Sequence, residues 1–424
     1  MENSQNVFSN RNFRVLWLGA LVCLIGDQLS LIALPWLVLK LTNSALAVGS
    51  VLAVIGVPRA IFILVGGTMT DRFEPKNVLL YARAISALLL FLLSILVWMD
   101  AINMPLLYLF ALLLGLASAF TLPAGMAILP TLLPPQQLQA GSGIMMSSMQ
   151  LSAVIGPILA GYVIAAFGQG SSSLQLVSDA VGIAIIFAVD GFSFLASVFS
   201  LLAIKFPLRA SIPDKTSLFA AVVSGYQYLK SDRSLFMYIF YIAIISFFIT
   251  GPAAVGIPVL VKTKFLGNAL EFGSFLTVQG IGMTLGMLLS TIFPRIPANR
   301  LGTGILLLDG LAGALVILFA QVSSIAAAFS ITFCIGMIGG FIQVVAFTWI
   351  QTRVQPEYMG RIMSYLMFAA LGLAPISSVL AGLLIAHTTV STMFTLVGMM
   401  MIVIVMLGLK NASIRNMGLP INAA

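Results

Sequence analysis

Three carboxylic acids interrupt long apolar runs of this chain: Asp27, Asp190 and Asp309. Two arginines, Arg59 and Arg83, do the same. A charged side chain at the centre of a bilayer costs about 2.5–3.5 kcal/mol on insertion scales, so such residues are candidates for function wherever the run crosses a membrane. Desolvation favours the neutral acid and a nearby arginine favours the carboxylate, so an acid held between these influences can exchange a proton. These residue types therefore offer the chemistry of proton coupling.

Asp27 and Arg59 are the pair that the spacing places best for that chemistry. At 1.5 Å per helical residue, Asp27 lies ~18 Å and Arg59 ~12 Å from the inner ends of two consecutive apolar runs. An ion pair between them is therefore expected. Two hypotheses follow: either Asp27 exchanges a proton as the conformation changes, or the pair is static and holds two helices together.

The other charged residues in apolar runs have different surroundings. Asp190 is followed by Ser193 and Ser197, and these small polar residues favour a helix packed on a polar interior, with direct proton coupling as the alternative. Asp309 lies about two turns into its run, where a structural or hydrated role is expected. Arg83 lies near the start of its run and is expected to be an interfacial anchor.

Uncharged polar residues also occur deep in the apolar runs. Buried amides and hydroxyls need partners, so these residues belong on inward faces and are candidates for lining a substrate cavity. They are Gln28, Ser147, Gln150, Thr250, Gln279 and Gln343. The two cysteines are far apart in the sequence and there is a single histidine, so neither a metal site nor a disulfide framework is expected.

Membrane-spanning helices are the elements that must position these residues. The 424 residues are 60% apolar and 8% charged, with a mean hydropathy of +1.12, against roughly 45–50% and ~25% in soluble domains. This composition excludes a soluble enzyme, a nucleic-acid-binding protein and a disordered chain. The runs are apolar throughout, which predicts helices rather than barrel strands, and each is long enough to span. We predict twelve spans, at 15–39, 45–67, 78–98, 105–128, 142–167, 180–204, 234–261, 272–293, 303–321, 325–350, 362–386 and 390–409.

Basic residues predict the orientation of these spans. Of the 20 lysines and arginines, two lie within spans and only Lys40, Lys262 and Lys264 fall on the outer side if both termini are cytoplasmic. The remaining basic residues lie on the inner side, as the positive-inside rule requires. The net charge of +8 is therefore a topology signal, and no nucleic-acid partner is expected.

The chain divides at its widest charged gap, which separates the sixth and seventh predicted spans. The sequence predicts an N-terminal six-helix bundle at 1–204, a cytoplasmic linker at 205–233 and a C-terminal six-helix bundle at 234–424. Leu218, Val222, Tyr226 and Leu229 recur at helical spacing and predict a short amphipathic helix within the linker. Two pseudo-symmetric six-span halves are the architecture expected of a transporter that works by alternating access.

The segment between the second and third spans resembles the cytoplasmic signature of the major facilitator superfamily. Gly67 is followed after three residues by Asp71 and Arg72, with Lys76 shortly after. Gly360 and Arg361, at the start of the eleventh span, resemble the bacterial efflux branch of that family, which includes macrolide, multidrug and siderophore exporters. Asp71 is expected to cap the positive N-terminus of the eleventh span and so latch the two halves together on the inner side.

Gly156, Pro157 and Gly161 in the fifth span resemble a motif of drug–proton antiporters. Helix packing alone is the other explanation, since glycine and proline are frequent in membrane helices for that reason. Both explanations stay open at this point.

The resemblance implies a secondary transporter of a bacterial inner membrane. We expect proton-driven export of an amphipathic small molecule of the macrolide or multidrug type, by a functional monomer. A siderophore or metabolite exporter of narrow specificity is the first alternative, and a nutrient symporter is the second. No Gly-rich nucleotide loop occurs in the sequence, so the proton gradient rather than a cofactor or ATP is the expected energy source. An enzyme is not expected, because the chain offers no cluster of nucleophile, base or metal ligands.

Overall fold

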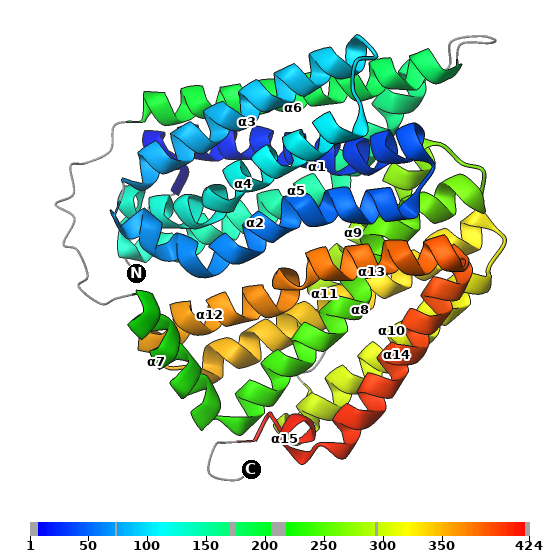
Figure 1. Ribbon diagram of the computed structural model, residues 1–424. Helices are drawn as coiled ribbons and strands as arrows, with labels where there is room; N and C mark the ends of the chain where they lie inside the picture. Colours follow the sequence, from blue (N-terminus) through cyan, green and yellow to red (C-terminus); the bar gives the residue numbers. More distant parts are fainter. Residues whose placement is uncertain (1–6, 73, 169–174, 205–217, 293–295, 420–424) are drawn as a thin grey trace. The chain divides into compact units, whose positions relative to one another are not determined.

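The structure is a computed structural model that describes residues 7–72, 74–168, 175–204, 218–292 and 296–419 (Figure 1). All regular elements in these ranges are helical. Eleven of the helices are long and apolar enough to cross a membrane, and the described apolar part of a further helix, Ala45–Ile61, is shorter. The all-helical membrane architecture is therefore confirmed.

The chain forms two compact units. The first comprises Met1–Asn43, Val54–Lys215 and Gly267–Thr277, and the second comprises Ser44–Ala53, Thr216–Leu266 and Val278–Ala424. Short pieces at the start of the second span and of the eighth therefore group with the other half of the sequence.

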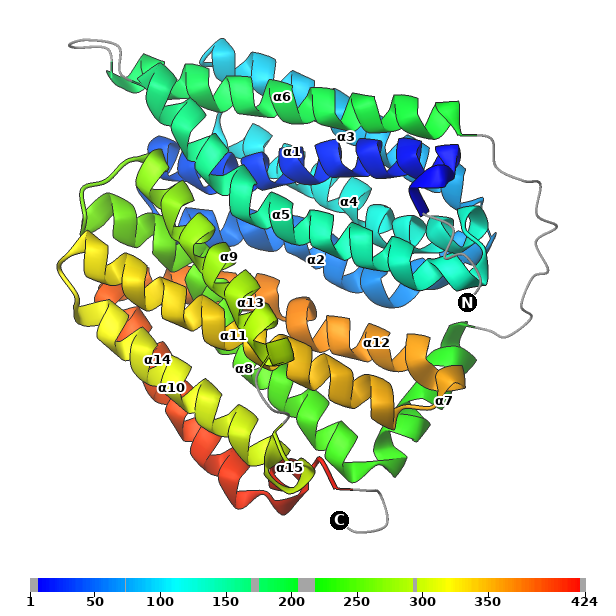
Figure 2. The same ribbon diagram turned by 180° about the vertical axis from the view of Figure 1, so that it is seen from behind.

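The first unit is built from six long helices. They are α1 (Arg11–Thr42), α2 (Ala45–Arg72), α3 (Pro75–Trp98), α4 (Met104–Leu132), α5 (Pro135–Gly168) and α6 (Gln175–Ala203). Helix α6 packs against both α1 and α3, as both views show, and α1 also packs against α5 (Figures 1 and 2). Because α6 lies between α1 and α3, polar side chains from three helices can meet in the interior of this unit.

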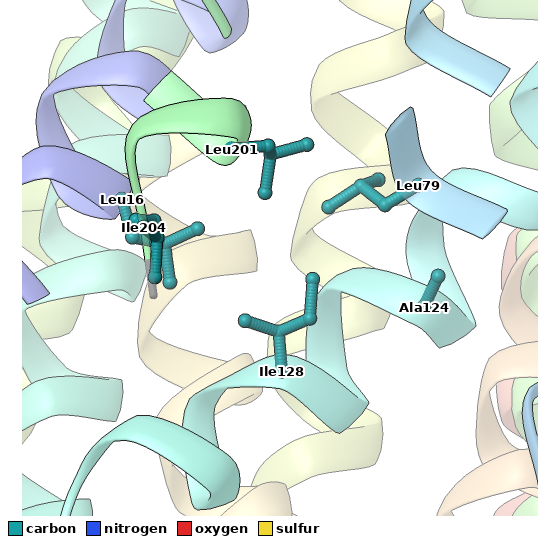
Figure 3. Packing of buried hydrophobic residues seen from close by; sticks show 6 residues of the cluster. All are labelled: Leu16, Leu79, Ala124, Ile128, Leu201 and Ile204. Atoms are coloured by element: carbon teal, nitrogen blue, oxygen red, sulfur yellow. The ribbon is translucent and has the colours of Figure 1, made fainter. Parts of the chain in front are cut away.

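A cluster of buried aliphatic residues closes one end of the first unit. Leu16, Leu79, Leu201 and Ile204 lie together with Ala124 and Ile128, and all are less than 5% exposed (Figure 3). Burying a leucine or isoleucine contributes roughly 1.5–3 kcal/mol. This cluster therefore fixes α1, α3, α4 and α6 at that end, so the polar residues further along the same helices keep their positions.

The second unit contains the remaining helices, except that α9 up to Thr277 groups with the first unit. They are α7 (Leu218–Ser231), α8 (Arg233–Thr263), α9 (Ala269–Ile292), α10 (Leu301–Gln321), α11 (Ile325–Arg353), α12 (Met359–Met367), α13 (Ala374–His387), α14 (Val390–Lys410) and α15 (Ala412–Arg415). Helix α8 packs against α13 and α14, and α14 against α10 (Figure 2). The helix that the sequence predicts in the linker is α7.

The predicted span at 362–386 is an interrupted helix. Helix α12 ends at Met367, a π-helical turn covers Phe368–Gly372, and α13 begins at Ala374 with Pro375 in its first turn. Proline has no N–H and is tolerated in the first turn, where that donor would be unsatisfied anyway. Pro375 therefore sits where a helix can restart.

Candidate functional site

Asp190 lies in a buried polar cluster at the middle of α6. Its side chain is 1% exposed. Ser30 of α1 donates its hydroxyl to Oδ2, and Ser193, one turn along α6, lies 3.1 Å from Oδ1. Gly26 of α1 faces this group, because a Cβ at that position would lie 2.8 Å from the Cβ of Ser193. The absence of a side chain at Gly26 is what allows the acid of α6 to pack directly against α1.

Arg83 belongs to the same interior, which corrects the expectation that it anchors the interface. It is 9% exposed, and its Nη1 donates to the hydroxyl of Ser197 on α6. The physical reason is that α6 presents a row of serines at the level of Arg83. A serine row can accept hydrogen bonds from a guanidinium that would otherwise have to reach the membrane surface.

Asp27 lies near the middle of the 32-residue α1 and is exposed. An acid at mid-span cannot face lipid without a large penalty, so Asp27 is expected to face a polar or hydrated part of the protein. Arg83 attracts the Asp27 carboxylate more strongly than Arg59 does. The carboxylate of Asp27 on α1 is thus within electrostatic range of Arg59 on α2 and of Arg83 on α3.

Among the residues that the structure describes, Asp27 and Arg59 do not form the direct ion pair that the sequence predicts. An ion pair with an N···O distance of at most 4.0 Å joins Arg353 and Asp232 instead. Similar depth in two helices does not bring side chains together, because the rotation of each helix about its axis also decides what they face. Arg59 is exposed, and its attraction to Asp27 acts over a longer range.

Asp309 in α10 has a hydroxyl donor of its own. Tyr241 of α8 donates its phenol to Oδ2 of Asp309 at 2.6 Å. Tyr238 and Tyr241 stack with ring centroids 6.4 Å apart. The sequence predicts a structural or hydrated role for Asp309, and this contact supports the structural one because it ties α8 to α10 within the second unit.

The predicted cavity-lining residues differ in exposure. Ser147 and Gln343 are exposed, whereas the other four are partly buried: Gln28, Gln150, Thr250 and Gln279. Their role in lining a cavity stays a prediction. In the described parts of the chain there is also no group of three or more His, Cys, Asp or Glu side chains that could hold a metal ion.

The fifth-span motif lies in tight helix contacts of the first unit. Gly156, Pro157 and Gly161 are all buried. A Cβ at Gly161 would lie 2.6 Å from the backbone oxygen of Ala269 in α9, and Thr277 donates to the carbonyl of Val154 at 2.8 Å. These contacts support a packing function for the motif and leave its role in antiport a prediction.

Part of the loop signature falls outside the described side chains. Gly67, Asp71 and Arg72 lie there, so the predicted cap by Asp71 on the eleventh span stays a prediction. Lys76 donates from Nζ to the carbonyl of Ile204 at 3.2 Å, just beyond the C-terminus of α6. A cation is stabilised at that end of a helix by the helix dipole.

The second signature segment lies at the start of α12. Gly360 is exposed, and a Cβ there would meet nothing within 4 Å. Arg361 donates from Nη1 to Ser224 of α7 at 2.8 Å, and its guanidinium lies 5.4 Å from the ring centroid of Tyr358. Arg361 therefore holds the linker helix against the start of α12.

The ion pair of Asp232 and Arg353 is a feature that sequence reasoning missed. Asp232 caps α8 by accepting from the backbone N–H of Ser234 and Leu235, and it binds Arg353 at 2.5 and 3.0 Å. Arg353 also donates to the carbonyls of two residues in the C-terminal segment. The sequence did contain a signal for the cap, because an aspartate, a residue type favoured at helix N-caps, directly precedes an apolar run.

Comparison of the sequence with known proteins shows the family of this chain. Residues 16–378 match the model of the Major Facilitator Superfamily. The chain is 26% identical over 388 residues to the multidrug efflux pump Tap of Mycobacterium tuberculosis. The aligned region covers 88% of this chain and 87% of the relative. It is 28% identical over 156 residues to the enterobactin exporter EntS of Salmonella typhimurium, which covers 37% and 38%.

Solved structures agree in fold. A bacterial homologue of the iron transporter ferroportin in its inward-facing state superposes with a TM-score of 0.72 at 16% identity, over 95% of this chain and 99% of that one. The nucleoside transporter NupG superposes with a TM-score of 0.71 at 13% identity, over 94% and 98%. With the family model matched over most of its length and this fold around a membrane-embedded polar cluster, the chain belongs to the Major Facilitator Superfamily of transporters.

Proposed function

We propose that this transporter exports amphipathic small molecules across the bacterial inner membrane in exchange for protons. The observation that carries the proposal is the cluster around Asp27 and Asp190, two acids near the middle of α1 and α6 in a chain similar to a multidrug efflux pump. Acids within membrane spans are costly and rare, and proton relays are one of the functions that they mark. The proposal includes twelve spans, cytoplasmic termini and a functional monomer without catalytic activity.

A vectorial transport assay tests this function. Purified protein is reconstituted into liposomes and offered ethidium and erythromycin as amphipathic probes. With an acidic interior, protons leave along their gradient, so an antiporter accumulates probe inside. We expect accumulation in these liposomes, its loss when an ionophore collapses the gradient, and none in protein-free liposomes.

The reverse gradient separates the alternatives. Accumulation that requires an acidic exterior would identify a symporter and contradict the proposal. The similarity to the enterobactin exporter favours one second candidate, a narrow siderophore exporter. Enterobactin accumulation by an acidic interior, with no response to ethidium or erythromycin, would establish that candidate instead.

A further inference from the structure

Two serine hydroxyls donate to the carboxyl group of Asp190, and one of them is shared with a backbone carbonyl. The Ser193 oxygen lies 2.7 Å from the backbone carbonyl of Asp190 and 3.1 Å from Oδ1 of the same residue. A serine hydroxyl carries a single proton, and the shorter contact, to the carbonyl, is the better bond. Ser193 therefore donates only weakly to Oδ1, and the site offers little hydrogen bonding that would stabilise a negative charge on Asp190.

The charges around Asp190 lead to the same result. The titratable groups that act on or beside this acid are Cys23 and Asp27 on α1, and Arg83 on α3 lies near both of these residues. Asp27 repels a charge on Asp190, and within the described residues no basic nitrogen lies within 4.0 Å of its oxygens. A buried carboxylate without a cation is strongly disfavoured, and the neutral form is not.

Arg83 has a donor that is still uncommitted. Its Nη1 binds Ser197, while its buried Nε has no hydrogen-bond partner among the described residues. Ser197 lies one turn from Ser193 along α6, and one turn is about 5.4 Å. A shift of the guanidinium by that distance would bring a cation to the level of the Ser193–Asp190 contact.

We propose that Asp190 is the residue that carries the exchanged proton. Arg83 is a positioning residue that stabilises Asp27 as a permanent carboxylate. It also compensates the negative charge of Asp190 once the proton has left. This inference rests on the proposed proton-coupled function. The step breaks the O–H bond of Asp190 and transfers the proton to water. Ser30, which contacts Asp190 and lies one turn from the exposed Asp27 on α1, connects the buried acid to the side of α1 that carries Asp27.

Infrared spectroscopy locates the proton without any substrate. The C=O stretch of a protonated carboxylic acid is resolved from that of a carboxylate, so the reconstituted protein is titrated and the band followed. We expect a band at neutral pH that disappears in Asp190→Asn and persists in Asp27→Asn and in Asp309→Asn. Ser193→Ala is expected to shift the band, whereas Ser152→Ala, a buried serine of α5 that bonds to the carbonyl of Ser148, leaves it in place.

Arg83 is tested by the pH profile of the same band. In Arg83→Gln the compensating cation is missing, so the band is expected to persist to more alkaline pH than in the wild type. A purely structural role of Arg83 would leave the profile of the band unchanged in folded protein, and that result would overturn its part of the proposal.

The transport assay then connects the proton to coupling. In Asp190→Asn, accumulation of ethidium is expected to fall to the level reached without a pH gradient, while equilibration of the probe continues. A band that survives in Asp190→Asn and disappears in Asp27→Asn overturns the inference, as does the absence of any band. If liposomes with the wild-type protein accumulate no probe in response to the pH gradient, the proposed function is overturned instead. The infrared result distinguishes this failure from a failure of the inference about Asp190.

Discussion

The ion pair between Asp232 and Arg353 predicts a large loss of stability when one partner is removed. The two side chains are 10% and 8% exposed. Arg353 also donates from Nη1 to the carbonyls of Met417 at 2.9 Å and Leu419 at 2.8 Å. Asp232 therefore neutralises a guanidinium that holds the C-terminal segment against α8 and α11, in addition to capping α8.

The size of the effect follows from these contacts. Breaking a buried pair by removing one partner costs ~3–5 kcal/mol, because the other charge stays buried. Losing an N-cap costs ~0.5–2 kcal/mol, and asparagine caps about as well as aspartate. Asp232→Asn should therefore show mainly the loss of charge, and Asp232→Ala should lose both contributions. At about 2–4 °C per kcal/mol for a unit of ~200 residues, the shift for the charge alone is ~6–20 °C.

Thermal unfolding of the purified protein in detergent, followed by tryptophan fluorescence, measures this shift. Glu357→Ala is the matched control, since Glu357 is an exposed acid. The double variant with Asp232→Leu and Arg353→Met should be more stable than either single variant, because an apolar pair leaves no uncompensated charge. A shift below about 2 °C in Asp232→Ala, or a double variant that merely adds the two losses, would refute the reasoning.

Three further predictions concern helix contacts. Gly26→Leu should separate α1 from α6 and abolish the folded peak in size-exclusion chromatography, whereas Gly143→Leu, at a position with nothing within 4 Å, should leave the peak unchanged. Tyr241→Phe removes the hydroxyl donor of the acid in α10 and should cost ~1–3 kcal/mol, measured as a lower unfolding temperature. Tyr228→Ala removes the stack of α7 on the start of α12, so trypsin should cleave faster after Lys230; an unchanged rate would mean that α7 is held elsewhere.

The spans were predictable because one physical requirement decides them. A run of ~20 apolar residues without a break can satisfy its backbone in lipid only as a helix. The run predicted at 234–261 is α8, at Arg233–Thr263, and the run predicted at 325–350 is α11, at Ile325–Arg353. The amphipathic spacing in the linker likewise predicted α7. Length and periodicity are local properties, so the sequence contains them.

The partners within the site were not predictable in the same way. Helices that are apolar on all sides give no signal for their rotation, so depth alone suggested a pair of Asp27 with Arg59. What decides the contacts is which residues α6 places opposite α1 and α3. Ser197 lies where it accepts from Arg83, and Ser193 where it meets the gap left by Gly26. The spacing of Asp190, Ser193 and Ser197 did mark one polar face of α6, but not which helices would cover it.

The two buried acids with hydroxyl neighbours show why proton exchange is expected in the first unit. Tyr241 has one hydroxyl proton and donates it to Asp309, which suits a carboxylate acceptor. Ser193 has one hydroxyl proton and its nearest acceptor is a backbone carbonyl, which leaves only a weak donation to Asp190. Both acids accept a hydroxyl hydrogen bond, from Tyr241 and from Ser30, but Asp190 also lies close to a second acid, Asp27, which repels a charge on it. For this reason the band of a protonated acid should follow Asp190 and be indifferent to Asp309.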